Sequence, residues 1–538
     1  MKKLGALLLA IACLSGVLPA AQPAAGPDTR LVLLIVVDQF RYDYLTRFRG
    51  EYTDGIKRLL TGGAVFTDAN LEHYPTVTAV GHSTMLSGAT PSVSGIIGND
   101  WFDRETGATV TSVSDPTVKP LGSPTGTAAS PRRLLVSTLG DELRMASGRP
   151  KGAPDAPRIV GVSMKDRSAI LPVGHSADAA YWWDAATASF VTSTYYFADE
   201  APEWVSAFNE RRLGDTHAGT WWTPLSTPSA SLRQFPAAPG AALYNAIYNS
   251  PVGNDLLLDF AGELLARHQL GVRNATDVLS ISFSSNDSVG HAYGPDSPQV
   301  RDIALRTDRS IGRLLNLVDR TVGLQRTLVA FTTDHGVAPL PETVRERGLP
   351  GGRLTSKELF EPIQQALAKR FGEGKWILAT AGSSPYLNDE HIAALGLDPA
   401  EVRRVAATAA AAVPHVARVY TRDDLLRGIV PDDRIGSRVL RGFLARRSGD
   451  LEIVLDPYWI RQAQGTTHGT PYSYDAHIPL VLMGRRVRPG EYSDHVALND
   501  LAPTLATLLG VEIPSGSVGR VLAEALQPAP TDAPRRRR

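Results

Sequence analysis

Cysteine is almost absent from this sequence: Cys13 is the only one in 538 residues. One cysteine cannot form an internal disulfide framework or a cysteine-rich metal site. A chain of this length can bury a large apolar core, so it needs no cross-links for stability. The composition therefore excludes the small disulfide-stabilised classes of secreted protein.

A net charge is also absent, since Lys and Arg total 55 and Asp and Glu total 55. A surplus of basic residues would have indicated nucleic acid or an anionic membrane surface as a partner. We therefore expect no nucleic-acid partner. Any attraction for anions must come from a local group of residues.

The N-terminus has two lysines, an apolar stretch and then small residues. This pattern predicts a secretory signal peptide over residues 1–21, too short for a stable membrane span. Export, with a periplasmic location in a Gram-negative source, is the expected fate. Lipid anchoring through Cys13 is the weaker alternative, because Ala10 is a poor residue three positions upstream of a lipidated cysteine.

The rest of the chain reads as one large α/β domain between two irregular ends. Residues 22–29 are expected to form a flexible leader and residues 526–538 a disordered basic tail. Alternating strand and helix patterns over residues 30–525 predict an α/β/α sandwich with a largely parallel central sheet. Inserted cap elements are expected near residues 180–255 and 340–450.

Acidic residues and histidines stand beside short apolar runs of the kind that form buried parallel strands. The pairings are LVLLIVV (31–37) with Asp38, VLSISF (278–283) with Asp287 and His291, TLVAFTT (327–333) with Asp334 and His335, and IPLVLM (478–483) preceded by His468. In open α/β sheets, the ligand crevice lies at the carboxyl ends of the strands. Carboxylates and imidazoles that converge there favour two divalent cations, which neutralise the acids and bind the neutral imidazoles.

Three further segments carry structural predictions. Apolar residues recur at helical spacing from Val300 to Val318, which predicts an amphipathic helix over the sheet. Residues 498–514 predict another helix that ends before Pro514. Residues 181–196 predict a β-hairpin outside the main sheet, in which Trp182 and Trp183 either wall a substrate pocket or pack on the domain surface.

A hydroxyl-rich segment offers a nucleophile. In residues 73–103, Thr78 begins a short helical pattern that ends at Gly88, so its hydroxyl would lie at a positive helix end. A bound divalent cation would lower the pKa of such a hydroxyl enough for it to attack a substrate. Taken alone, the segment does not choose among Thr76, Thr78, Ser83 and Thr84, which are also typical caps or helix-surface residues.

Together, these motifs resemble the alkaline phosphatase superfamily. They are Asp38, TVTAVGHST (76–84), GIIGNDWFD (95–103), SMKDR (163–167), DSVGH (287–291), TDHG (333–336) and GTTHGTPYSYDAHIP (465–479), in the family's order. The resemblance is greatest to the threonine-nucleophile, phosphate-irrepressible bacterial alkaline phosphatases. The resemblance extends over roughly residues 30 to 515. These phosphatases are related to the nucleotide pyrophosphatase/phosphodiesterase branch of the superfamily.

The resemblance implies two zinc ions and a role for each ligand. Asp287, His291 and His468 would hold one zinc ion, and Asp38, Thr78, Asp334 and His335 the other, although manganese or cobalt also suit mixed Asp/His sites. Thr78 would be the nucleophile, because Asn99 follows it at the family's separation of 21 positions. Because this ligand set is already full, we expect His82 and His477 to be structural or to orient the ligands rather than to bind metal.

Lys165 and Arg167 indicate the substrate class. They follow the apolar run RIVGVSM (158–164), so we expect them in the same crevice, where with Asn99 they would bind the two extra charges of a phosphate monoester. The phosphodiesterase branch lacks this basic pair. A sulfatase is disfavoured, because that family needs a cysteine or a serine for conversion to formylglycine and the mature chain has no cysteine.

The sequence thus predicts a zinc-dependent alkaline phosphomonoesterase that acts through a phosphothreonine. The expected substrates are small phosphate monoesters, with inorganic phosphate as product and inhibitor, and the expected state is a monomer. The alternative is a phosphodiesterase or nucleotide pyrophosphatase that uses the same pair of metals. A binding protein without activity is the least favoured reading, because no element needed for catalysis is missing.

Overall fold

The computed structural model describes residues 28–227 and 229–527. The predicted signal peptide, most of the leader and most of the basic tail lie outside these ranges. Within them, no helix is both long and apolar enough to cross a membrane.

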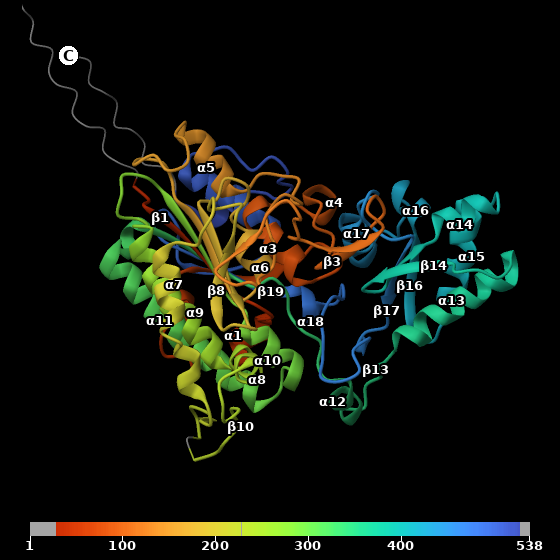
Figure 1. Ribbon diagram of the computed structural model, residues 1–538, viewed down its shortest axis with the longest axis horizontal. Helices are drawn as coiled ribbons and strands as arrows, with labels where there is room; N and C mark the ends of the chain where they lie inside the picture. The colour runs from red at the N-terminus through yellow and green to blue at the C-terminus, as the bar shows by residue number, and fades with distance from the viewer. Residues whose placement is uncertain (1–27, 228, 528–538) are drawn as a thin grey trace, which may run out of the picture.

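A ten-stranded sheet forms the centre of the larger of two lobes (Figure 1). Its strand order is β20, β2, β19, β12, β1, β11, β6, β7, β8, β5. The strands are β1 (Leu31–Val37), β2 (Ala64–Asn70), β5 (Pro120–Leu121), β6 (Ile159–Ser163), β7 (Ala179–Asp184), β8 (Ser189–Ser193), β11 (Asp277–Phe283), β12 (Thr327–Thr332), β19 (His477–Met483) and β20 (Gly490–Ala497). The five strands from β12 to β7 are parallel to one another, as predicted for the runs that form β1, β11 and β12.

The sheet is covered on both faces, because its central strands are apolar on both. All seven residues of β1 are buried; Leu33, Ile35 and Val37 contribute to one apolar core, and Val32, Leu34 and Val36 to the other. Helices α9 (Pro251–Arg267) and α11 (Pro298–Thr321) pack in the first core, and α3 (Thr78–Ser87), α5 (Leu139–Ser147) and α19 (Leu501–Leu509) in the second. The predicted α/β/α sandwich is confirmed.

Both predicted helices are present. In α11 the apolar residues from Val300 to Val318 lie on the buried face, as expected. The second helix, α19, is shorter than predicted, since it ends at Gly510 in a left-handed conformation with φ 69°. Three residues (511–513) separate Gly510 from Pro514, so the glycine and not the proline terminates the helix.

Two predictions about strands were wrong. β19 runs antiparallel to β12 and β2, although its apolar run had predicted a parallel strand. The hairpin of β7 and β8 belongs to the main sheet, where β7 pairs with β6. Trp182 and Trp183 are therefore core residues on opposite faces of the sheet, neither a pocket wall nor a surface patch.

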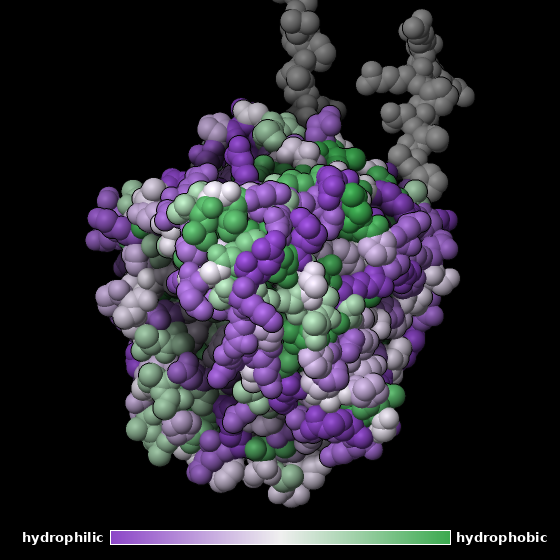
Figure 2. Space-filling view, turned by 90° about the vertical axis from the view of Figure 1, so that its right-hand side faces the viewer, coloured by the Kyte–Doolittle hydropathy of each residue, from purple (hydrophilic) through white to green (hydrophobic). Residues whose placement is uncertain are grey.

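A smaller lobe has its own core and its own sheets (Figure 1, right). It contains helices α13 (Ser356–Phe371) and α15 (Pro399–Ala411) and the strand pairs β14 (Ile377–Ala381) with β15 (Ser384–Leu387) and β16 (Val416–Thr421) with β17 (Leu451–Leu455). These elements overlap the region near residues 340–450 where an inserted segment is expected, and that insertion stays a prediction. Figure 2 views the molecule from this side and shows hydrophilic and hydrophobic residues interspersed over the surface.

Candidate metal and phosphate site

The strand directions bring distant ligands to one edge of the sheet. Asp38 directly follows β1, and Asp334 follows β12 after one intervening residue. Asp287 and His291 lie one turn apart on α10 (Ser285–Tyr293), which begins just after β11. Because β19 is antiparallel, the chain that precedes it, including His468, also reaches the carboxyl end of β12. The antiparallel strand explains why a ligand can stand before an apolar run.

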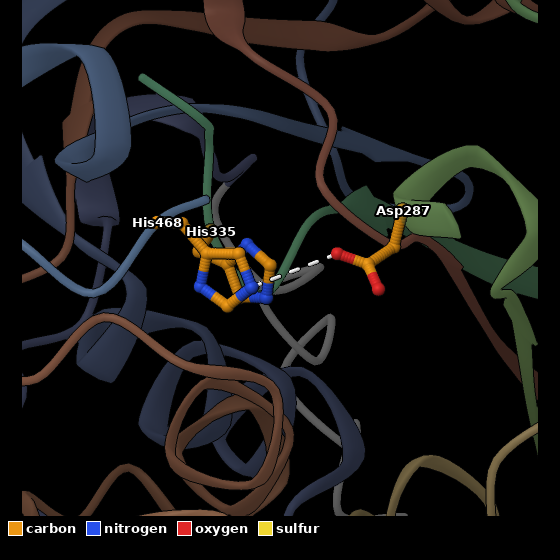
Figure 3. A group of neighbouring side chains, drawn as sticks. All are labelled: Asp287, His335 and His468. Carbon is orange, nitrogen blue, oxygen red and sulfur yellow. Dashed lines mark ion pairs between the residues drawn. The ribbon is translucent and has the colours of Figure 1, made fainter. Parts of the chain in front are cut away.

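Two groups of side chains have the geometry of metal sites. The ligand atoms of Asp287, His335 and His468 lie within 4.8 Å of one another, as do those of Asp38, Asp334 and His335. Figure 3 shows the first group, in which the rings of His335 and His468 are stacked with centroids 3.5 Å apart and Asp287 faces them. His335 contributes to both groups, so the two sites are adjacent.

His291 borders the first group. Its Nε2 atom lies 3.1 Å from Oδ1 of Asp287, and Nε2 of His468 lies 3.6 Å from the same oxygen. The predicted ligands Asp287, His291 and His468 therefore lie close together. In the second group, Nε2 of His335 lies 3.3 Å from Oδ2 of Asp334 and 3.6 Å from Oδ1 of Asp38.

The orientation of the imidazoles is fixed by the backbone. The Nδ1 atom of His291 lies 2.7 Å from the carbonyl oxygen of Thr466, that of His335 lies 3.0 Å from the carbonyl oxygen of Gly336, and that of His468 lies 2.8 Å from the carbonyl oxygen of Thr76. A carbonyl accepts only from a protonated Nδ1, so in the neutral ring Nε2 is left as the lone-pair donor. All three rings thus present the tautomer that binds a metal.

The charges in the site also fit bound cations. Burial and the nearby Asp334 carboxylate raise the pKa of Asp38 well above its usual value. Burial lowers the pKa of His335, and burial with the neighbouring histidines lowers that of His468, so both rings are held neutral, as metal ligands require. Oδ1 of Asp38 and Oδ2 of Asp334 are buried without a hydrogen-bond partner among the described residues. These orphaned oxygens and neutral imidazoles form a donor set suited to divalent cations.

Thr78 lies at the first residue of α3, next to both groups. Its Oγ1 atom is 3.3 Å from Nε2 of His335 and 3.5 Å from Nζ of Lys165. The helix approaches closely because Gly81 has no side chain: a Cβ there would lie 2.3 Å from the carbonyl oxygen of Asp334. Thr76, the alternative nucleophile, donates its hydroxyl hydrogen to the carbonyl oxygen of Thr470 at 2.8 Å. Of the two threonines, Thr78 has the hydroxyl placed for chemistry.

Lys165 joins the two groups. It is the N-cap of α6 (Asp166–Ile170), and its Nζ atom lies 2.7 Å from Oδ2 of Asp38 and 2.7 Å from Oδ2 of Asp287. Although burial disfavours the charged amine, the carboxylates of Asp287 and Asp38 hold the pKa of Lys165 above its usual value. The ammonium therefore stays charged at the point where both sites meet.

Asn99 and Arg167 differ in how far the structure brings them into the site. Oδ1 of Asn99 accepts a hydrogen bond from the backbone N–H of Ala79 at 2.9 Å, which leaves its amide N–H groups to bind an anion beside Thr78. The Arg167 side chain is 27% exposed, and its guanidinium pairs with the Asp166 carboxylate at 3.8 Å. Asn99 is thus held at the entrance of α3, whereas Arg167 lies at the rim.

Reasoning from the sequence missed Gln39. This buried residue has a left-handed backbone with φ 60°, and its side-chain amide donates to Oδ1 of Asp287 at 2.6 Å. Its backbone N–H donates to Oδ1 of Asp334 at 3.2 Å. The only signal in the sequence was its position directly after Asp38.

Two further histidines, His82 and His477, have different surroundings. His82 is buried, with Nδ1 2.9 Å from the carbonyl oxygen of Thr78 and Nε2 2.9 Å from Oγ of Ser282. Nε2 of His477 is 2.9 Å from the carbonyl oxygen of Thr67, and its ring stacks on Tyr42. His82 thus also borders the second group, with Nδ1 3.3 Å from Oδ2 of Asp334, whereas His477 is engaged away from both groups.

Comparison with known proteins identifies the family. A model of the type I phosphodiesterase / nucleotide pyrophosphatase family matches residues 32–475. The chain belongs to this family. It lies within the alkaline phosphatase superfamily, on the side of the PafA-type enzymes: it is 34% identical to the alkaline phosphatase PafA of Elizabethkingia meningoseptica, over 96% of this chain and 98% of that protein.

Other proteins and solved structures are also similar to this chain. The chain is 34% identical to the alkaline phosphatase PhoV of Synechococcus elongatus, over 94% of this chain and 95% of that protein. The crystal structure of wild-type PafA superimposes with a TM-score of 0.86 and covers 94% of this chain and all of that one. Murine ectonucleotide pyrophosphatase / phosphodiesterase 5, at 15% identity and a TM-score of 0.52, shares the fold.

Proposed function

We propose that the protein is an exported, monomeric alkaline phosphatase that hydrolyses phosphate monoesters and releases inorganic phosphate. The observation that carries the proposal is the position of Lys165, whose ammonium lies 2.7 Å from a carboxylate of each metal group and 3.5 Å from the Thr78 hydroxyl. A phosphate group bound over Thr78 would meet this cation directly. The relatives named alkaline phosphatase support the same activity.

The side chains suggest a division of labour. Two zinc ions, held by Asp287, His291 and His468 and by Asp38, Thr78, Asp334 and His335, would lower the pKa of the threonine hydroxyl and offset the charge of the phosphoryl group. The Thr78 oxygen would attack phosphorus in line, forming the Oγ–P bond as the bond to the leaving alcohol oxygen breaks. Water would then cleave the phosphothreonine and release phosphate.

Three side chains would hold the oxygens of the phosphoryl group. Asn99 would donate through its free amide, Lys165 through its ammonium and Arg167 through its guanidinium after turning in from the rim. Charge on these oxygens changes in the transition state, so such contacts contribute to the rate. Two cationic side chains suit a dianionic monoester better than a monoanionic diester.

A phosphodiesterase is the second candidate, because the matching family model carries that activity in its description. The test is a substrate panel on purified protein of known metal content, with an aryl phosphate, its methyl diester and an aryl sulfate. We expect the highest kcat/KM for the monoester. A higher value for the diester would replace the proposal with the phosphodiesterase, and preference for the sulfate would reject both.

A further inference from the structure

A cavity of about 430 Å³ opens beside the candidate site, between the two lobes. On the larger lobe it is lined by Asn99, His468 and the Tyr74 ring, and on the smaller lobe by Ser384, Glu452 and Trp459, among others. This volume suits a small organic group. A phosphoryl group held by Asn99, next to the proposed metal ligand His468, would direct its leaving alcohol into this space.

Strand geometry turns Glu452 toward the cavity. In β17 the alternate residues Leu451, Ile453 and Leu455 are buried in the core of the smaller lobe. Side chains alternate across a strand, so Glu452 and Val454 lie on the other face, where Val454 packs with Tyr74 of the larger lobe. The sequence thus puts a carboxylate on a strand face that otherwise makes apolar contacts.

The negative charge of the Glu452 carboxylate is stabilised by few contacts with the described residues. Its Oε1 atom accepts a hydrogen bond from Oγ of Ser384 at 3.1 Å, and no ion pair to it is found in residues 28–227 and 229–527. The one arginine that lines the cavity, Arg461, instead donates to Ser356 and lies over the ring of Phe360. Burial raises the pKa of Glu452 to about 7. A carboxylate in such surroundings is stabilised by a cation or a strong donor.

We propose that this cavity is the leaving-group subsite and that Glu452 selects phosphate monoesters whose alcohol carries a positive charge, such as an amino alcohol. The inference rests on the proposed phosphatase function and adds a substrate class to it. The ammonium of such a substrate would pair with Glu452 while the phosphoryl group binds at Thr78. Tyr74, Tyr386 and Trp459 would surround the connecting carbons.

The experiment compares three substrates that differ in the charge of the leaving alcohol: 2-aminoethyl phosphate, propyl phosphate and 2-carboxyethyl phosphate. Values of kcat/KM are measured for the wild type and for Glu452→Gln, at a pH where the phosphates are dianionic and the amine is protonated. The glutamine can still accept from Ser384 but carries no charge. Differences in intrinsic reactivity cancel, because each substrate ratio is compared between two proteins. Glu390→Gln, an exposed change on the same lobe, is the control.

We expect the ratio of aminoethyl to propyl phosphate to fall roughly tenfold in Glu452→Gln and the ratio of carboxyethyl to propyl phosphate to rise, with both unchanged in the control. Glu452→Asp keeps the charge, so it should retain the wild-type order of kcat/KM among the three substrates. This variant keeps the inference testable if Glu452→Gln does not fold. Unchanged ratios in Glu452→Gln, or an equal loss on all three substrates, would overturn the inference. Hydrolysis of an aryl phosphate but of none of the three would also overturn the inference, whereas failure of the wild type on all three and on the aryl phosphate would instead refute the phosphatase function itself.

Discussion

The side-chain amide nitrogen of Gln39 lies 2.6 Å from Oδ1 of Asp287. The backbone N–H of Gln39 also donates to Asp334, so this one residue is hydrogen-bonded to a carboxylate of each metal group. Removing an orienting partner of a metal ligand typically costs about 10- to 100-fold in metal affinity or activity. We expect Gln39→Ala to weaken metal binding by that factor, as measured by competition with a chelator of known affinity. Gln365→Ala, at an exposed position, is the matched control. Equal affinities in Gln39→Ala and wild type would show that the contact does not orient the ligands.

Much of the site could be predicted from the sequence, because the carboxyl ends of parallel strands lie at the same edge of a sheet. Asp38 and Asp334 stand directly after apolar runs, so the fold class alone places them. The direction of β19 could not be predicted, since an apolar run reports burial and not orientation. Trp182 was misplaced because an aromatic hairpin pattern is the same inside a sheet and outside one. Gln39 has no periodicity or motif that would single it out.

Thr78 provides a direct test of the nucleophile. Thr78→Ala removes the attacking oxygen, so we expect turnover of an aryl phosphate to be lost, whereas Thr78→Ser keeps a hydroxyl and should retain a measurable part of it. Steady-state kinetics on proteins of equal metal content check this. Thr76→Ala is the control, because its hydroxyl bonds to Thr470 instead. Near-wild-type rates in Thr78→Ala would transfer the role to another residue.

Metal removal should inactivate the protein reversibly. Without cations, the neighbouring carboxylates of Asp38 and Asp334 repel each other, and the ammonium of Lys165 offsets part of that repulsion. We therefore expect dialysis against a chelator to abolish activity and to lower the melting temperature, and added zinc to restore both. Metal analysis before and after dialysis provides the measurement. Full activity in protein that contains no metal would contradict the two-metal site.

Asp475 should make stability depend on pH. Burial raises the pKa of this carboxyl to about 7, above its ordinary 3.8, while Thr470 donates two hydrogen bonds to Oδ2. A carboxyl whose folded pKa is raised binds more protons in the folded state, so its contribution to stability falls as pH rises from about 4 to about 7 and is level above that. At pH 8 its ionisation costs up to about 4 kcal/mol, at 1.36 kcal/mol per pKa unit.

Asp475→Asn cannot ionise and keeps an acceptor for Thr470. The free energy of unfolding of this variant, relative to wild type, should therefore increase between pH 4 and pH 7 and then stay constant. Denaturant titrations of metal-saturated protein at several pH values measure it. A difference that is independent of pH would show that Asp475 is already ionised throughout this range.

The most direct test of a phosphomonoesterase is the effect of removing Lys165 and Arg167 on two matched substrates. Each charge-assisted contact contributes about 1.5–3 kcal/mol, and about 1.4 kcal/mol corresponds to a tenfold change in rate. For the Lys165→Ala/Arg167→Ala double variant we expect kcat/KM for an aryl phosphate to fall by roughly two to four orders of magnitude, and that for its methyl diester to fall far less. Equal losses on both substrates would contradict the account, because the basic pair would then not select the dianionic monoester.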